Sequence, residues 1–299
     1  MKLLRLPMAP ATTTTNNRRY GIAYLCLSCF FWAAVELTGF FVPRGYSALQ
    51  TVWARYVFHI FFILIVFVPS QRTNLIRTHS LKVQLFRPVL MIGMPLFFLL
   101  GIRFLTQEAV WAVFWIAPLM VLVLAAILLK ERIGLPYWLA TIGGFVGVLA
   151  IFQPRLVRLF NWTLILPLGM AFCFSLYLVL TRFLHAENTV TNLFYTGLVV
   201  SLAYSFGLPY FWKTMNITAL LTMSMIGFLG FWVLYFLDKA LERTPTSVLA
   251  PFLYTQPIFA LFLNSFFFRQ FPGFMRLAGS LALIGIGIFL ALLRMQNEG

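Results

Sequence analysis

Charged residues are scarce in this chain. Only 10% of its 299 residues are Asp, Glu, Lys or Arg, and only seven of these are acidic, whereas soluble domains carry about 25% charged residues to keep their surface solvated. With 62% hydrophobic residues and a mean hydropathy of +0.92, the chain cannot cover a water-facing surface. A soluble enzyme or soluble binding domain is therefore excluded.

Groups that perform covalent chemistry are also few. The chain has three His, and it lacks a Ser-centred elbow, an HExxH motif and an acidic metal cluster, which argues against a membrane-embedded hydrolase or transferase. We expect no catalytic residue, no metal site and no cofactor. No GxxxxGK[ST] loop is present, so ATP-driven pumping by this chain is not expected. Cys26 and Cys29 form a CxxC inside an apolar run without a second pair nearby, and we interpret them as inert buried thiols.

What the chain does contain is a series of apolar runs from Tyr20 to the C-terminus. Each is long enough to cross about 30 Å of hydrocarbon as a helix. We therefore predict an all-α integral membrane protein with about ten transmembrane helices. The expected spans are residues 20–42, 47–69, 84–104, 107–128, 136–153, 160–182, 190–211, 217–238, 245–268 and 273–293.

The positive charge is expected to set the orientation rather than to bind nucleic acid. The net charge is +15, but Lys and Arg fall mostly in short loops between apolar runs; Arg87, at the start of the third expected span, is counted with the loop before it. The side that holds both termini carries about twice as many Lys and Arg as the other side, which predicts cytoplasmic termini. Residues 1–19 are interpreted as a disordered cytoplasmic tail rather than a cleaved signal, with an organellar transit peptide as the alternative, and residues 295–299 as a second short tail.

An internal repeat divides the chain. Aligning residues 109–134 with residues 248–273 places Pro118 on Pro257 and Gly134 on Gly273, and a Gly-containing apolar run follows in both copies. We predict two five-helix repeats, residues 20–154 and 155–294. Because five is odd, the second repeat must enter the membrane from the opposite side, an arrangement that carriers use to build a binding site near the midplane.

Several motifs, taken in order, resemble the ten-helix EamA form of the drug/metabolite transporter superfamily. They are Phe31–Trp32, Arg55 within LQTVWARYVFHIFF, the segment from Trp111 to Glu131 with Pro118 inside it, and APFLYTQPIF followed by FPG. The resemblance implies a secondary carrier of a small organic solute in the cell inner membrane, working without ATP. Riboflavin, S-adenosylmethionine and amino acids are the candidate solutes, and coupling to protons is open. Many relatives have a second acidic helix-closing residue where this chain has Gln270.

The first two spans carry opposite charges, and Glu36 is the only one of the seven acidic residues expected well inside a span. Glu36 lies roughly 9 Å and Arg55 roughly 12 Å below the expected outer edge, at about 1.5 Å per residue, so the two side chains are predicted to meet. One interpretation is a neutral pair that only joins the two helices. The other is a carboxylate that binds protons or a cationic group of the solute. His59, one turn beyond Arg55, is either a further protonation site, since its ordinary pKa is near 6.5, or a packing residue.

Aromatic residues make up 18% of the chain, and two helical stripes of them are candidates for the walls of a solute cavity. Interfacial anchoring is the alternative for the two tryptophans. Pro118 and Pro257, one in each stripe, are candidate hinges, since each removes a backbone hydrogen bond and bends its helix. Gly143 and Gly147, four apart, are expected to allow close helix packing. The stripes consist of Trp111, Trp115 and Pro118 in the first half and Tyr254, Pro257 and Asn264 in the second.

A channel or receptor without a transport cycle is the remaining alternative. Ten spans with an internal repeat fit neither a seven-span receptor nor a pore built on a filter loop. The expected partners are a small organic solute and the lipid bilayer, with protons left open, and nucleic acid is not expected. The sequence does not indicate an oligomeric state.

Overall fold

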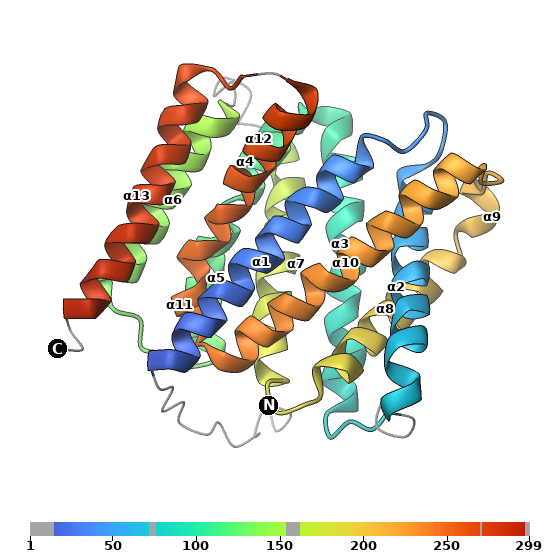
Figure 1. The fold of residues 1–299 in the computed structure, drawn as a ribbon, viewed down its shortest axis with the longest axis horizontal. Coiled ribbons are helices and arrows are strands. Elements are labelled where there is room, and N and C mark those ends of the chain that lie inside the picture. Colours follow the sequence, from blue (N-terminus) through green and yellow to red (C-terminus); the bar gives the residue numbers. More distant parts are fainter. Residues whose placement is uncertain (1–14, 72–75, 154–161, 270, 297–299) are drawn as a thin grey trace.

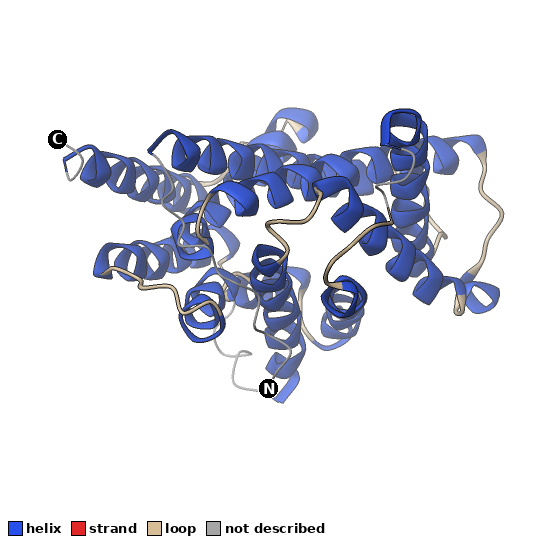
Figure 2. Cartoon of the chain, turned by 90° about the horizontal axis from the view of Figure 1, so that it is seen from below, coloured by secondary structure: helices blue, strands red, loops and turns tan. Residues whose placement is uncertain are grey.

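A computed structural model describes residues 15–71, 76–153, 162–269 and 271–296. Within these ranges the chain folds into helices and loops (Figure 2). Most of the expected N-terminal tail, Arg72, Arg155, Arg158, Gln270 and residues 297–299 lie outside the described residues. The helices are α1 (Thr15–Gly39), α2 (Ala48–Gln71), α3 (Leu81–Phe104), α4 (Gln107–Phe114), α5 (Ala117–Leu128), α6 (Leu135–Phe152), η2 (Trp162–Leu164), α7 (Ile165–Phe183), α8 (Thr189–Ser205), α9 (Leu208–Phe211), α10 (Ile217–Arg243), α11 (Thr246–Leu249), η3 (Ala250–Tyr254), α12 (Thr255–Phe268) and α13 (Phe274–Gln296).

These helices reproduce the ten expected spans. Eight apolar segments of the described chain have the length and hydropathy to cross a membrane, and Phe274–Leu290 forms a shorter apolar helix. The remaining expected span corresponds to α8 and α9. The chain is thus an all-α, multi-pass membrane protein with about ten spanning segments. Most bounds differ from the prediction by one to three residues, as where α3 begins at Leu81 rather than at residue 84. The differences at two ends are larger: α1 begins at Thr15 rather than at residue 20, and α10 continues to Arg243 rather than ending at residue 238.

Polar residues in the loops define where several helices begin. The side chain of Thr106 accepts a hydrogen bond from the backbone of Ala109 at the start of α4, and Asn216 accepts one from Ala219 at the start of α10. Such caps satisfy N–H groups that have no partner within the helix. The described part of α1 begins, and that of α13 ends, at the lower edge of Figure 1, opposite the loop between α1 and α2.

The packing of the helices has an internal symmetry. α1 lies along α10, and α3 lies along α7 (Figure 1). Likewise α1 packs on α12 as α5 packs on α7, and α2 packs on α10 as α3 packs on α8. In each of these three pairs, the second contact joins the spans that lie five places along the chain from the spans of the first contact. The two halves of the chain therefore make equivalent contacts. The contacts α2–α8 and α6–α13 join spans that are already five apart.

Glycine permits the closest of these symmetric contacts. A Cβ atom on Gly279 of α13 would lie 2.7 Å from the carbonyl oxygen of Gly147 in α6, so the backbones touch there. The expected packing role of Gly147 is confirmed. A Cβ on Gly143 would lie 3.1 Å from Ile286, an ordinary tight contact.

Candidate functional site

A cavity of about 550 Å³ lies within the bundle, lined by residues of α1, α2, α3, α4, α7, α10 and η3 together with the α1–α2 loop. Its volume falls within the range of about 300–1,000 Å³ that is typical of sites for small organic molecules. Both halves of the chain contribute to its walls. The side chains that give it chemical character are Trp32, Glu36, Arg55, Phe98, Trp111 and Phe174.

The cavity reaches the surface at one end and is closed at the other. Its lining includes Arg44 and Gly45 in the α1–α2 loop, both of which are exposed. At the opposite end, Leu25, Leu237 and Leu253 line both the cavity and a separate void of only about 10 Å³. A layer of leucine side chains therefore separates the cavity from the side of the molecule where α1 begins.

The structure brings the two predicted charges, Glu36 and Arg55, to the same cavity without pairing them. No ion pair with N···O within 4.0 Å joins them in the described part of the chain. The Glu36 carboxylate lies near the side chains of Gln256 and Trp32 and interacts with the charge of Arg55 at longer range, but its Oε1 atom has no hydrogen-bond partner. The neutral pair that would only join α1 to α2 is therefore not formed in this conformation.

Gln256 is a member of this site that the stripe argument left out. It is 2% exposed, comes from the start of α12, and its Nε2 atom has no hydrogen-bond partner. An unused amide donor thus lies near a carboxylate with an unused acceptor. Gln256 directly precedes Pro257 at the second position of α12, and the packing of α1 on α12 brings it near Glu36.

Aromatic side chains form much of the remaining wall. The ring of Trp32 lies 5.2 Å from that of Phe174 and 6.2 Å from that of Phe114, measured between centroids. Trp111 contacts Phe98 at 5.3 Å and Phe114 at 5.4 Å in the same way. Because each ring is held by its neighbours, the wall presents fixed apolar faces with a few polar groups between them.

Four predicted residues lie outside the lining of this cavity: His59, Trp115, Tyr254 and Asn264. His59 is 1% exposed and packs against Phe231 and the carbonyl oxygen of Leu193, which fits the packing interpretation. Asn264 is partly buried in α12, and its Oδ1 atom has no partner.

Trp115 and Tyr254 instead form the contact between the two repeats of the sequence. They occupy aligned positions, their rings are 6.1 Å apart, and the Tyr254 hydroxyl donates to the Trp115 carbonyl oxygen at 3.2 Å. Trp115 is 0% exposed, so interfacial anchoring does not apply to it. The stripe argument identified residues on one face, but only Trp111 of these stripes lines the cavity, whereas Trp115 and Tyr254 pack against each other.

Both candidate hinge prolines follow a break in a helix. Pro118 is the second residue of α5, after α4 has ended at Phe114, and Pro257 is the third residue of α12, after the 3-10 helix η3. Proline is tolerated in a first helical turn because the N–H group it lacks would have no partner there. The bend therefore comes from a break at equivalent places in both halves.

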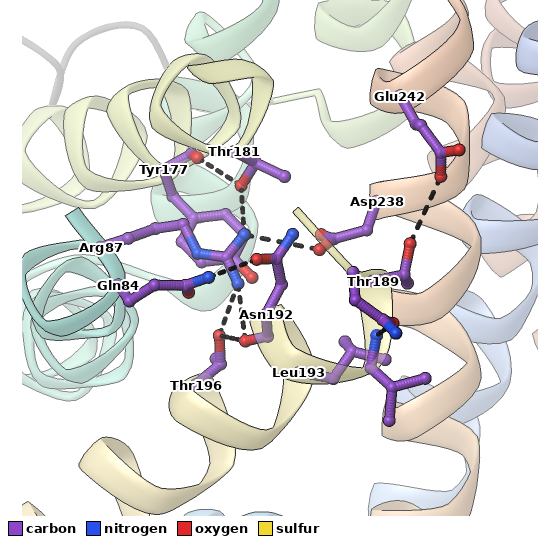
Figure 3. A network of polar contacts seen from close by, with 12 residues as sticks. Gln84, Arg87, Tyr177, Thr181, Thr189, Asn192, Leu193, Thr196, Asp238 and Glu242 are labelled. Carbon is purple, nitrogen blue, oxygen red and sulfur yellow. Dashed lines mark hydrogen bonds and ion pairs between the residues drawn. The ribbon is translucent and has the colours of Figure 1, made fainter. Parts of the chain in front are cut away.

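A second buried polar cluster lies outside the predicted site. Figure 3 shows the Arg87 guanidinium between α7, α8 and α10. Arg87 pairs with Asp238 at 3.5 Å and donates to Thr181, to Thr196 and to the carbonyl oxygen of Asn192. The ring of Tyr177, a cavity-lining residue, lies 4.9 Å from the guanidinium carbon.

This cluster corrects two predictions. Arg87 is not a loop residue: it is 0% exposed within α3. Glu36 is not the one acidic residue well inside a span, because Asp238 is 3% exposed within α10. Both residues lie near a predicted end of a span. Because α3 begins at Leu81 and α10 continues to Arg243, each lies at least one helical turn inside its helix and packs within the bundle.

Glu131 joins the two halves of the chain at the end of the fold that lies opposite the opening of the cavity. Its carboxylate accepts hydrogen bonds from the backbone N–H groups of Thr246 at 3.0 Å and Ser247 at 2.9 Å, and from the Ser247 hydroxyl. It thereby caps α11, in the other half of the chain. The aligned residue, Gln270, lies outside the described residues.

No metal or redox site emerges from the described part of the chain. It contains no group of three His, Cys, Asp or Glu residues that could hold a metal ion. Cys26, Cys29 and Cys173 are free thiols.

Fold and cavity together define a class: a polytopic helical membrane protein whose two structurally related halves enclose a cavity of solute size. Its sequence places it more narrowly. The pattern of the EamA-like transporter family matches residues 19–153 and again residues 161–293. The chain belongs to this family, and it is a membrane transporter of the drug/metabolite transporter type.

Individual proteins support the same assignment. The chain is 23% identical over 271 residues to the S-adenosylmethionine uptake transporter of Rickettsia conorii, an alignment that covers 90% of this chain and 92% of the relative. A segment of 77 residues, 26% of each chain, is 29% identical to the riboflavin transporter of Vibrio cholerae. A crystal structure matches with a TM-score of 0.79, covering 93% of this chain and 99% of the other at 14% identity, which shows a shared fold.

Proposed function

We propose that this protein is a secondary carrier that binds a small organic solute in the cavity and releases it on the opposite side of the membrane by alternating access. The observation that carries the proposal is the cavity itself, which contains Glu36 and Arg55 among fixed aromatic rings and is accessible from one end. Ionisable residues at membrane depth are costly and usually serve transport. Alternating access requires that the cavity be closed to one side of the membrane while it is open to the other. The leucine layer provides this closure at the end opposite the opening.

Two inverted repeats supply the physical basis for the alternation. The exchange symmetry of the helix contacts supports a twofold relation between residues 20–154 and 155–294. If the second half adopts the packing that the first half has now, the cavity closes at the α1–α2 loop and opens past Leu25, Leu237 and Leu253. The breaks before Pro118 and Pro257 are the proposed pivots, because backbone there is already free of regular helix bonds.

The orientation follows from charge. Arg87 is buried in the bundle and is not counted among the loop charges. Without it, the side that holds the termini still carries clearly more Lys and Arg than the other side. We place both termini in the cytoplasm and the protein in the cell inner membrane. The described conformation is then open to the outside. Proton coupling through Glu36 belongs to this proposal, whereas the sequence and fold indicate no oligomeric state.

S-adenosylmethionine is the first candidate solute, since relatives that align over almost the whole chain carry its name. Riboflavin and amino acids follow. The test is uptake of each labelled compound by liposomes containing the purified full-length protein, with and without an imposed proton gradient. Uptake above that of protein-free liposomes for at least one compound is expected. Equal uptake by both preparations for every compound would contradict the carrier function.

A further inference from the structure

The cavity contains one anion and one cation that the protein does not pair. Glu36 lies three residues before the end of α1, and Arg55 lies seven residues after the start of α2. At about 1.5 Å per residue, their backbone positions differ in depth by roughly 6 Å. They therefore present opposite charges to the cavity at two levels.

Neither charge is fully satisfied by other described residues. The Oε1 atom of Glu36 lacks a hydrogen-bond partner, and the one directed contact of the Arg55 guanidinium within the described chain is the ring of Tyr56, 5.5 Å from its Cζ atom. Both residues are partly buried, and an unpaired charge at membrane depth is costly. A group that arrives with the solute would remove this cost.

The buried pair of Arg87 and Asp238 shows how this protein accommodates an arginine that has a structural role. Arg87 has a carboxylate partner and three hydrogen-bond acceptors, and it lines no cavity. Arg55 has the same chemistry but faces open volume. The difference indicates that the partner of Arg55 is not part of the protein.

Arg55 is held in place by glycines of α10. A Cβ atom on Gly230 would lie 2.7 Å from Nε of Arg55, and one on Gly227 would lie 2.9 Å from the Arg55 carbonyl oxygen. α2 therefore approaches α10 closely at this level, and the guanidinium lies against bare backbone. This contact limits the directions that the Arg55 side chain can take, which lowers the entropy cost of binding.

The aromatic wall completes the site. Trp32 lies between the carboxylate of Glu36 and the ring of Phe174, while Trp111 and Phe98 form a second ring pair. Such faces stack on a planar ring and attract a cationic group. The arrangement thus offers an anion, a cation and a stacking surface within one cavity.

We propose, on the basis of the carrier function above, that the transported solute carries both a carboxylate and a cationic group, attached to a planar ring. Its carboxylate binds Arg55, which forms bidentate contacts with carboxylates. Its cationic group binds Glu36 and its ring lies on the tryptophan wall. This class includes aromatic amino acids and amino-acid conjugates of a nucleoside, and it excludes uncharged flavins.

Two sets of compounds test the inference by transport into liposomes containing the full-length protein. In the first, S-adenosylmethionine is compared with decarboxylated S-adenosylmethionine and with uncharged methylthioadenosine. In the second, tryptophan is compared with tryptamine, which lacks the carboxylate, and with indole propionate, which lacks the cation. Riboflavin represents uncharged rings. We expect the member with both charges to be preferred by at least about tenfold in one set, because each charged hydrogen bond contributes about 1.5–3 kcal/mol.

Variants assign each charge to its residue. Arg55→Gln is expected to abolish the preference for the carboxylate-bearing compound over its decarboxylated analogue, and Arg55→Lys is expected to retain part of it. Glu36→Gln is expected to abolish the preference for tryptophan over indole propionate or, in the first set, to reduce S-adenosylmethionine transport at least about tenfold. Arg103→Gln, at the exposed end of α3 away from the cavity lining, controls for general loss of positive charge. Melting of each purified variant confirms that it is folded.

The outcomes separate the inference from the carrier function. Transport of riboflavin, or of analogues with charge of one sign only, as fast as the compounds that carry both signs would leave the carrier function standing and overturn the inference. A preference that survives Arg55→Gln in folded protein would also overturn it. Failure to transport any compound of either set, riboflavin included, would count against the carrier function itself.

Discussion

Removal of the positive charge from the buried Arg87 cluster should be strongly destabilising. Arg87→Met keeps most of the side-chain length but leaves the carboxylate of Asp238, which is 3% exposed, without its cation. Thr181 and Thr196 keep their backbone hydrogen bonds to Tyr177 and Asn192, at 2.7 Å and 2.8 Å, so they add little. The cost of an uncompensated buried charge dominates, and we expect a loss of about 3–5 kcal/mol.

The two partners should not be equivalent. Asp238→Asn leaves Arg87 with three acceptors, on Thr181, Thr196 and Asn192, so we expect a smaller loss of about 1–3 kcal/mol. The double variant Arg87→Met with Asp238→Leu removes both charges and should be more stable than Arg87→Met alone. This order follows from the number of partners each charge retains.

The assay is equilibrium unfolding of the purified variants in mixed micelles of mild detergent and dodecyl sulfate, followed by tryptophan fluorescence. Equal losses of unfolding free energy for Arg87→Met and Asp238→Asn would show that the hydrogen bonds of Arg87 do not stabilise its charge when Asp238 is absent. A double variant less stable than Arg87→Met would refute the argument that an unpaired carboxylate causes the loss.

Three further predictions concern packing, capping and orientation. Gly144→Ala should cost about 1–3 kcal/mol in the same unfolding assay, because the new Cβ would lie 2.3 Å from the ring of Tyr254; Gly285→Ala, with no neighbour within 4 Å, is the matched control, and equal losses would contradict the reasoning. Glu131→Gln should destabilise by about 1 kcal/mol, since it weakens the bonds to the start of α11, whereas Glu131→Asp should retain part of them; an unchanged midpoint for Glu131→Gln would count against the cap. Green fluorescent protein fused to the C-terminus should fluoresce while alkaline phosphatase fused there stays inactive, and the reverse result would place that end outside.

The spans could be predicted because apolar length alone determines which segments cross the membrane. The aligned prolines also located both helix breaks, since proline restricts where a regular helix can continue. Glu36 and Arg55 were predicted to meet from their depth alone; the cavity contains both, but no ion pair joins them within the described residues. Depth along a helix is a one-dimensional property, which the sequence carries directly.

Direction around the helix was harder to predict. Trp115 shares a stripe with Trp111, yet Trp111 lines the cavity and Trp115 packs against Tyr254, because the surroundings of each side chain depend on which neighbouring helix lies at its level. Asp238 was missed because its burial depends on α10 continuing past the apolar run. Such features are set by neighbouring helices rather than by the local pattern.

The central claim is that one cavity exposes Glu36 and Arg55 alternately to the two sides of the membrane. Counterflow tests it most directly: liposomes containing the protein are loaded with an unlabelled solute from the two compound sets and diluted into its labelled form. A carrier predicts transient accumulation of label above equilibrium for at least one doubly charged solute, and loss of this overshoot in Glu36→Gln. Simple equilibration without overshoot, or an overshoot that Glu36→Gln leaves intact, would contradict it.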